Sequence, residues 1–370
     1  EVSKNACTSS SNAAQFKVDS KPIYRSIISA NGNWSDYTNW EMSTDYINYS
    51  AACTYPRERN SSEVIIQNGT YIIYDLTGAD EITIDKVTIE TNGTLELSPS
   101  SKLTINDSVS GADLIVNGSL LDRTNTFSSL AFSSGVTWLL GANGTIVKSN
   151  SGAVSLYRNA YEGGMNSIPS TANWIYRYNG DGNPSVGSTN FFYPNLSFEN
   201  TSGSTYSWNG FTSSFVGSAG GFATVKGDFR IGVSGTSACL VSNVNSNSQP
   251  MLIHGDLEIA TGSELINQNS TSGLFGTGFE LKGDLTVNGA LKITGTSEER
   301  VMRFTSNSDQ NISGTGTINV HKTTVDKISG RLILNRNYRS QNELQMTRGN
   351  IFTNSNILEL GENTSQKGTL

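Results

Sequence analysis

The feature that most constrains the fold of this chain is a pentapeptide that occurs three times, with a spacing of 28 residues. The copies lie at residues 227–231, 255–259 and 283–287, and each reads Gly-Asp followed by an apolar, a polar and an apolar residue. A fixed period with apolar residues at alternate positions indicates stacked coils of β-strand. Two strands that meet at a Gly-Asp bend, without helical segments between copies, predict an all-β fold, a right-handed parallel β-helix (solenoid).

A second pattern supports the same fold. Asn-Gly followed by a small or polar residue and an apolar residue begins at positions 68, 92, 117 and 143, at spacings of 24, 25 and 26 residues, and recurs at 288. Asn and Gly both tolerate positive φ, so each pair can turn the chain between strands. Asn-Gly is also the commonest hairpin signal. The regular spacing near 25 residues favours the corner of a coil over a hairpin.

Composition narrows the class of protein. Of 370 residues only 35% are hydrophobic and 15% are charged, which suits a thin core under polar outer faces. The net charge is −7 and no cluster of Lys and Arg stands out, so we expect no nucleic-acid partner. No apolar run approaches the ~18 residues of a membrane-spanning helix, so we expect no membrane span. For a chain of this length, the repeats favour one continuous solenoid over two globular domains.

The repeats divide the chain into a cap and a body. Residues 1–60 lack the pattern and contain Trp34 and Trp40, which predicts an N-terminal capping segment with these two rings in its core. Residues 61–370 are predicted as coils, with an irregular excursion at about 121–195 where the rhythm loosens. The pattern stops without a capping signal after Leu360, so we expect the native chain to continue beyond residue 370.

The three cysteines are Cys7, Cys53 and Cys239. In an oxidising compartment, a Cys7–Cys53 disulfide would staple the cap and leave Cys239 as a buried thiol. The odd number of cysteines weakens the case for that pairing.

Several motifs carry a resemblance to a known group of proteins. They are Gly-Asn-Trp-Ser-Asp at 32–36, Val-Ile-Ile-Gln-Asn-Gly at 64–69, Tyr-Pro-Asn-Leu-Ser-Phe at 193–198 and the three Gly-Asp coils. Together they resemble the secreted, repeat-bearing surface proteins of Bacteroidota, over nearly the whole sequence. Such proteins are often large adhesins or gliding-associated proteins exported by the type 9 secretion system.

The resemblance implies a secreted or cell-surface location. The partners that it implies are a surface polysaccharide or another cell-surface protein, and the secretion translocon during export. Asp107-Ser108-Val109 is similar to the O-glycosylation acceptor pattern of that phylum, which makes Ser108 a candidate for glycosylation.

The stacked Asp228, Asp256 and Asp284 form the sharpest cluster of candidate ligands. At about 4.8 Å between stacked strands, three carboxylates would form a column that could hold Ca²⁺. The alternative is that each Asp bonds the backbone at its own bend. The basic residues of the same register are expected to partly neutralise the column; they are Lys226, His254 and Lys282.

The sequence gives less support to a zinc site or to a polysaccharide-degrading active site. His254 and His321 are the two histidines, and neither has a second His or Cys at ligand spacing, so we expect no zinc site. The lysines beside His254 are expected to disfavour its protonation. Parallel β-helices include polysaccharide lyases and polygalacturonases, but the chain lacks the paired aspartates of the latter, so a polysaccharide-degrading enzyme is only an alternative.

The aromatic segment at Trp174, Tyr176 and Tyr178 has two interpretations. The three rings could form a platform on which sugars stack, or they could be the packed side chains of a half-buried strand.

Taken together, the repeats and the resemblance predict a non-catalytic extracellular rod region of a large surface adhesin or gliding-associated protein. A carbohydrate-binding β-helix that uses residues 173–182 is the alternative.

Overall fold

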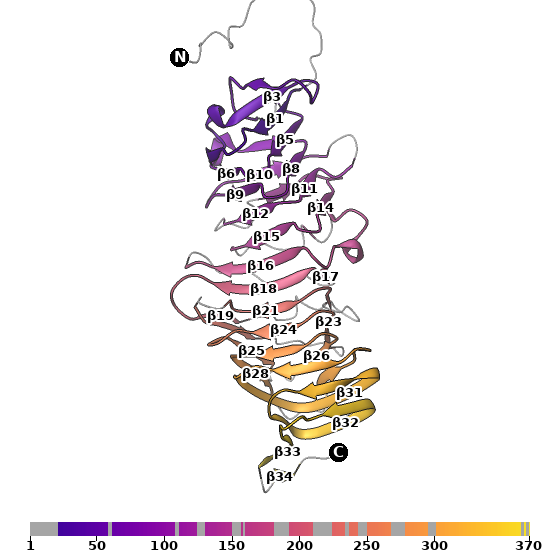
Figure 1. Ribbon diagram of the computed structural model, residues 1–370. Coiled ribbons are helices and arrows are strands. Elements are labelled where there is room, and N and C mark those ends of the chain that lie inside the picture. Colours follow the sequence, from indigo (N-terminus) through magenta and orange to yellow (C-terminus); the bar gives the residue numbers. More distant parts are fainter. Residues whose placement is uncertain are drawn as a thin grey trace, which may run out of the picture. The chain divides into compact units, whose positions relative to one another are not determined.

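The computed structural model describes residues 21–57, 61–107, 111–123, 130–149, 157, 160–180, 192–209, 224–233, 237–242, 250–267, 278–294, 301–363, 366–367 and 370. The chain forms two compact units. Unit 1 contains residues 1–152 and 159–164, and unit 2 contains residues 153–158 and 165–370. Each unit is an all-β stack of mostly parallel strands, as the repeats predict and as in a parallel β-helix or solenoid (Figure 1).

The described strands of unit 1 stack in three columns. The first column contains, in spatial order, β14 (Trp138–Leu140), β11 (Leu114–Val116), β8 (Val87–Ile89), β5 (Glu63–Ile66), β1 (Ile23–Ser26), β3 (Trp40–Ser43) and β4 (Ser50–Ala51). The second contains β2 (Asn31–Asn33), β6 (Tyr71–Tyr74), β9 (Thr94–Leu97), β12 (Ser119–Asp122) and β15 (Thr145–Lys148). The third contains β7 (Ile82–Ile84), β10 (Leu103–Ile105) and β13 (Leu130–Phe132). The predicted Asn-Gly corners at 68, 92, 117 and 143 each join a strand of the first column to one of the second.

The segment predicted as a cap contains a coil and an antiparallel cover. β1 and β2 pair in parallel with β5 and β6, so the stacking begins at Ile23 and not at residue 61. β3 then pairs antiparallel with β1, and β4 with β3, which covers the edge of the first column. The short 3-10 helix η2 (Tyr37–Asn39) precedes β3.

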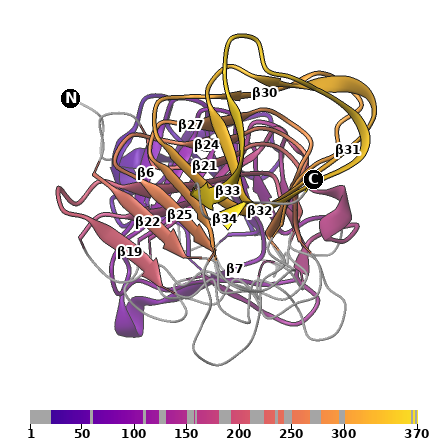
Figure 2. The ribbon, with the colours of Figure 1, turned by 90° about the horizontal axis from the view of Figure 1, so that it is seen from below.

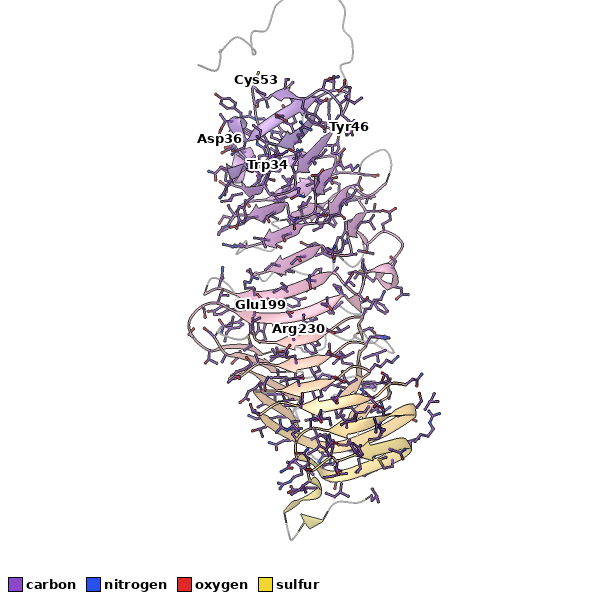
Figure 3. All side chains as sticks on the ribbon, in the orientation of Figure 1. Trp34, Asp36, Tyr46, Cys53, Glu199 and Arg230 are labelled. Carbon is purple, nitrogen blue, oxygen red and sulfur yellow. The ribbon has the colours of Figure 1, made fainter. Side chains whose placement is uncertain are left out.

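Trp34 and Trp40 are fully buried, with ring centroids 4.9 Å apart in an edge-to-face contact. The Trp34 indole donates to Pro56 O, and the Trp40 indole donates to Trp34 O. Figure 3 shows Trp34 within unit 1. The two rings are therefore core residues, as predicted from their place in the unpatterned segment.

The described strands of unit 2 also stack in three parallel columns (Figures 1 and 2). The first contains β16 (Asn173–Tyr178), β18 (Asn195–Asn200), β21 (Phe229–Ile231), β24 (Leu257–Ile259), β27 (Leu285–Val287) and β30 (Gln310–Ser313). The second contains β17 (Phe192–Tyr193), β20 (Thr224–Val225), β23 (Met251–Ile253), β26 (Gly278–Leu281) and β29 (Val301–Phe304). The third contains β19 (Tyr206–Asn209), β22 (Cys239–Ser242), β25 (Glu264–Asn267) and β28 (Ala290–Ile293).

Towards the C-terminus of unit 2, single long strands pass through several columns. β31 (Thr317–Leu334) pairs in succession with β28, β29 and β30, and changes register at its bends. β32 (Tyr338–Phe352) follows β31, and β33 (Leu358–Asn363) pairs in parallel with β32. β34 (Gln366–Lys367) then pairs antiparallel with β33. The remaining 3-10 helices are η3 (Gly78–Asp80) in unit 1 and η4 (Met165–Ser167) in unit 2.

The predicted register of the Gly-Asp coils is confirmed. Leu257 pairs with Phe229 in the preceding coil and with Leu285 in the following one, and all three side chains are buried. The second stack, at Ile231, Ile259 and Val287, is also fully buried. The alternation of apolar and polar residues therefore directs the same side chains inward in each coil.

The expected irregular excursion at about 121–195 is wrong for the strands β14, β15 and β16, while described residues 162–172 form turns and η4. β14 and β15 pair in register with β11 and β12 in unit 1, and in unit 2 β16 pairs with β18 over six residues, Asn173 to Tyr178. Alternate residues of β16 point inward, and the inward positions hold aromatic rings in place of aliphatic side chains. Because aromatic residues replace aliphatic ones in β16 and the connections between strands are longer, the sequence pattern did not reveal these coils.

The repeated glycine at each Gly-Asp bend is required by close stacking. A Cβ added to Gly283 would lie 2.2 Å from the carbonyl oxygen of Gly255 in the preceding coil. We expect Gly283→Ala to lower the free energy of unfolding by about 2–3 kcal/mol, because the coils would have to separate. Gly203→Ala is the matched control in unit 2, since Gly203 has positive φ but open space around it, and it should cost only about 1 kcal/mol. Equal losses in urea denaturation would contradict the stacking argument.

Candidate functional site

The predicted aspartate column is the centre of a longer hydrogen-bonded array in unit 2, which we call the Asn/Asp ladder. It follows the first column of strands from coil to coil. Its members are Asn173, Asn195, Asp228, Asp256, Asp284, Asn311, Asn335 and Asn354.

In the central part of the ladder, a side-chain oxygen accepts a hydrogen bond from the backbone of the next coil. Asp228 Oδ1 accepts from the N–H of Asp256 at 3.0 Å, and Asp256 Oδ1 accepts from the N–H of Asp284 at 2.7 Å. Asn195 does the same for Asp228 at 2.8 Å, and Asp284 for Asn311 at 2.8 Å. Each rung therefore joins two coils that are far apart in sequence, in addition to the backbone hydrogen bonds of the strands.

Asparagines extend the ladder at both ends through their amide groups. Asn195 Nδ2 donates to Asn173 Oδ1 at 3.3 Å, and Asn335 Nδ2 donates to Asn311 Oδ1 at 3.1 Å. Asn354 Nδ2 donates in turn to Asn335 Oδ1 at 3.0 Å. Sequence reasoning missed these members because the separations between successive rungs range from 19 to 33 residues. The available signal was that an Asn or an Asp recurs in each of these coils.

This geometry corrects the expectation that each Asp bonds its own bend, because the bonds cross to the next coil. It also engages one oxygen of each carboxylate, whereas Ca²⁺ is held by several free oxygens. Asp228 Oδ2 pairs with Arg230 Nη2 at 2.6 Å, and Asp284 Oδ2 accepts from Asn311 Nδ2 at 3.0 Å. In the part of the chain that the structure describes, no three His, Cys, Asp or Glu side chains are grouped to hold a metal ion.

Among the basic residues beside the ladder, Lys226 binds the backbone of a neighbouring segment. Lys226 Nζ donates to Asn166 O at 2.9 Å and to Ile168 O at 2.7 Å, so it holds the segment around η4. The pKa of His254 is lowered, first by partial burial and then by the charges of Lys282 and Lys226. The expected effect of the lysines is therefore present, although burial is the larger cause.

The other histidine, His321, lies where β31 changes register between Val320 and Lys322.

The ladder makes a prediction about stability. Asp256→Asn keeps the oxygen that accepts from Asp284, adds an amide donor and removes one of three stacked charges, so the variant should be at least as stable as the native chain. Asp256→Ala removes the acceptor and should cost about 1 kcal/mol. Urea denaturation of the two variants tests this. An alanine variant as stable as the native chain would show that the rung contributes nothing.

The predicted aromatic platform does not form from Trp174 and Tyr176. Both side chains are fully buried inward residues of β16. The Trp174 ring packs edge-to-face on Tyr157 at 5.3 Å, and Tyr176 stacks on Phe198 of the next coil at 5.3 Å. The packed-strand interpretation of these two rings is therefore the correct one.

Tyr178 differs from the other two rings because it is partly exposed. It stacks on Tyr206 of β19, with ring centroids 3.7 Å apart and planes inclined by 15°. Each ring therefore uses one face against the other. Next to Tyr178 in sequence, Arg177 forms an ion pair with Glu199 of β18 at 2.7 Å. Figure 3 labels Glu199 together with Arg230, which lies on the neighbouring strand β21.

One of the two described cysteines is disulfide-bonded and the other is a thiol. Cys53 is disulfide-bonded, and its predicted partner Cys7 lies outside the described residues. Cys239 is a free, fully buried thiol whose pKa is raised to about 12, chiefly by burial. Ser108, the candidate for O-glycosylation, also lies outside the described residues.

An ion pair inside unit 1 escaped the sequence analysis. Lys148 Nζ lies 3.1 Å from Asp122 Oδ2, and both side chains are at most 3% exposed. The two residues pair in register on β15 and β12, in the inward column that Tyr74 and Leu97 occupy in earlier coils. A charged residue at an inward position breaks the apolar pattern, so no sequence signal points to it.

Among the described residues, no helix has the length and apolar character needed to cross a membrane. Compared with known proteins, the chain matches no family model, no curated protein and no solved structure.

Proposed function

We propose that this chain is a non-catalytic structural segment of a large extracellular surface protein, an adhesin or gliding-associated protein exported by the type 9 secretion system. The observation that carries the proposal is the continuous cross-coil bonding of unit 2. Buried apolar columns and the Asn/Asp ladder join coil to coil from Asn173 to Asn354. Such a stack displays or spaces binding elements while it resists separation of its coils.

Two further observations support this proposal. Cys53 is disulfide-bonded, and disulfides persist mainly in oxidising compartments such as the extracellular space. Pairs of opposite charge also join neighbouring coils on the outer faces, as in Arg331–Asp309 at 2.7 Å and Lys322–Glu343 at 2.9 Å. We further propose that the coils wind in the right-handed sense expected of parallel β-helices.

The carbohydrate-binding alternative has less support, because two of its three predicted platform rings, Trp174 and Tyr176, are buried in the core. Tyr178 with its stacked neighbour Tyr206 is what the described residues keep of that platform. The partners that we propose are a surface polysaccharide or another surface protein, with the export translocon during secretion.

Protease treatment of intact cells tests the proposed location. An antiserum against unit 2 should detect the native protein on untreated cells and lose that signal after treatment, while a cytoplasmic marker stays intact. In a strain that lacks type 9 export, the protein should accumulate inside the cells and resist the protease. A native protein that stays protected in the exporting strain would contradict the proposal.

A further inference from the structure

The five Asn-Gly corners of the sequence pattern differ in how the glycine is packed. An Asn-Gly step can lose ammonia spontaneously, because the glycine nitrogen can attack the side-chain amide carbon of the asparagine. The attack closes a five-membered ring across the two residues. It therefore needs an accessible glycine nitrogen and space for the asparagine side chain to swing over it.

At four of the corners the glycine is packed closely against neighbouring backbone. A Cβ built on Gly93 would lie 2.8 Å from Ile66 O, and one on Gly118 would lie 2.2 Å from Gly93 O. The corresponding distances are 2.2 Å from Gly144 to Val116 O and 2.1 Å from Gly289 to Ser263 O. Each of these glycines is held against the backbone of a neighbouring coil or turn.

The backbone N–H groups of these four glycines are also engaged. Gly93 donates to Glu90 O at 2.8 Å, and Gly144 donates to Gly141 O at 2.9 Å. Gly118 donates to Ile89 O at 3.2 Å, and Gly289 to Ile259 O at 3.1 Å. Attack from these nitrogens requires the corner to open first, and local opening of a packed segment costs free energy.

Asn68–Gly69 is the open corner. Both residues are exposed, and a Cβ on Gly69 would meet no atom within 4 Å. The Gly69 N–H also donates a hydrogen bond, to Asn92 O at 3.3 Å, so it is the open space around Gly69 that sets this corner apart. Asn68 also lines a cavity of about 300 Å³, which it shares with Glu90, Thr91 and Asn117.

We propose that Asn68 is a site of spontaneous deamidation, which converts faster than the asparagines of the other four corners. The Gly69 nitrogen gives up its proton to water and bonds to Cγ of Asn68, and the Cγ–Nδ2 bond breaks as ammonia leaves. Water then opens the resulting succinimide at either carbonyl and yields aspartate or isoaspartate. The net reaction consumes one water and releases one ammonia, with no oxidation or reduction.

The conversion changes the chemistry of the corner. It adds a carboxylate beside Glu90, whose Oε2 accepts the Asn68 N–H at 3.1 Å. Neighbouring like charges repel, and isoaspartate also inserts an extra backbone carbon into the turn. Deamidation at Asn68 therefore alters the polar cavity at the coil corners of unit 1 while the buried columns stay in place.

Peptide mapping by mass spectrometry tests the proposal. The folded chain is incubated at mildly alkaline pH, and the conversion of all five asparagines is followed with time. We expect Asn68 to convert at least about tenfold faster than Asn92, Asn117, Asn143 and Asn288, because a packed corner must first open by about 1.4 kcal/mol or more. Equal rates at all five corners of the folded chain would overturn the proposal.

The same incubation in denaturant separates packing from local sequence. The unfolded chain should convert all five asparagines at similar rates, since each is followed by glycine. If Asn68 keeps its advantage in the unfolded chain, packing is not the cause and the proposal fails. Asn68→Gln is the control variant: it should remove the fast reaction and leave the other four rates unchanged.

Discussion

Leu257→Asp is expected to unfold unit 2 at temperatures where the native chain stays folded. Leu257 is fully buried between Phe229 and Leu285 of the adjacent coils. The substitution removes a large apolar side chain and places an unpaired carboxylate in the core. We therefore expect a loss of more than about 5 kcal/mol, comparable with the whole stability of many domains. Circular dichroism melting measures the change.

Glu258→Lys is the matched control, because Glu258 is the next residue along β24 and points outward. Its side chain is exposed and lies 3.6 Å from Arg230, a surface contact that contributes little. We expect a change of at most about 1 kcal/mol. Equal melting temperatures for Leu257→Asp and Glu258→Lys would show that the inward and outward positions of the coil are wrongly assigned.

Lys148→Met is expected to have the second largest effect, in unit 1. The substitution removes the ammonium partner of the Asp122 carboxylate, which is only 3% exposed. Removing one partner of a buried ion pair typically costs about 3–5 kcal/mol. The loss should appear as a lower denaturation midpoint of unit 1.

Replacing both partners distinguishes a buried charge from a loss of packing. Asp122→Leu together with Lys148→Met continues the apolar column of Tyr74 and Leu97, and should restore most or all of the stability. If the double variant is as unstable as Lys148→Met, the missing charge partner does not explain the effect. Side-chain packing at this coil would then be the cause.

The sequence predicts the fold where spacing and alternation agree. At residues 227–287 a constant period and alternate apolar residues are enough to place Phe229, Leu257 and Leu285 in one stack. β16 shows where that logic weakens, since its inward Trp174 and Tyr176 look the same in sequence whether they bind a ligand or fill a core. Only the neighbouring coil decides between the two, and its contacts are not local in sequence.

The Asn/Asp ladder was predictable only where the spacing of its members is constant. The carboxylates of Asp228, Asp256 and Asp284 align because their spacing is constant, and this much was visible. Their asparagine neighbours in the ladder are separated by unequal connections, so no period reveals them. The buried Asp122–Lys148 pair was invisible, because charged residues at an inward position are identified by their surroundings and not by any pattern.

Deletion of one whole coil from the native protein tests most directly the proposal that the chain is a structural segment. Removing residues 256–283 joins Gly255 to Asp284, and keeps both the inward stack and the ladder in register, since equivalent positions lie 28 residues apart. If the coils serve as a spacer, cells with the shortened protein should display it at native levels and attach to surfaces as native cells do. Loss of attachment by a folded, displayed variant would instead place a specific binding site in that coil and contradict the proposed function.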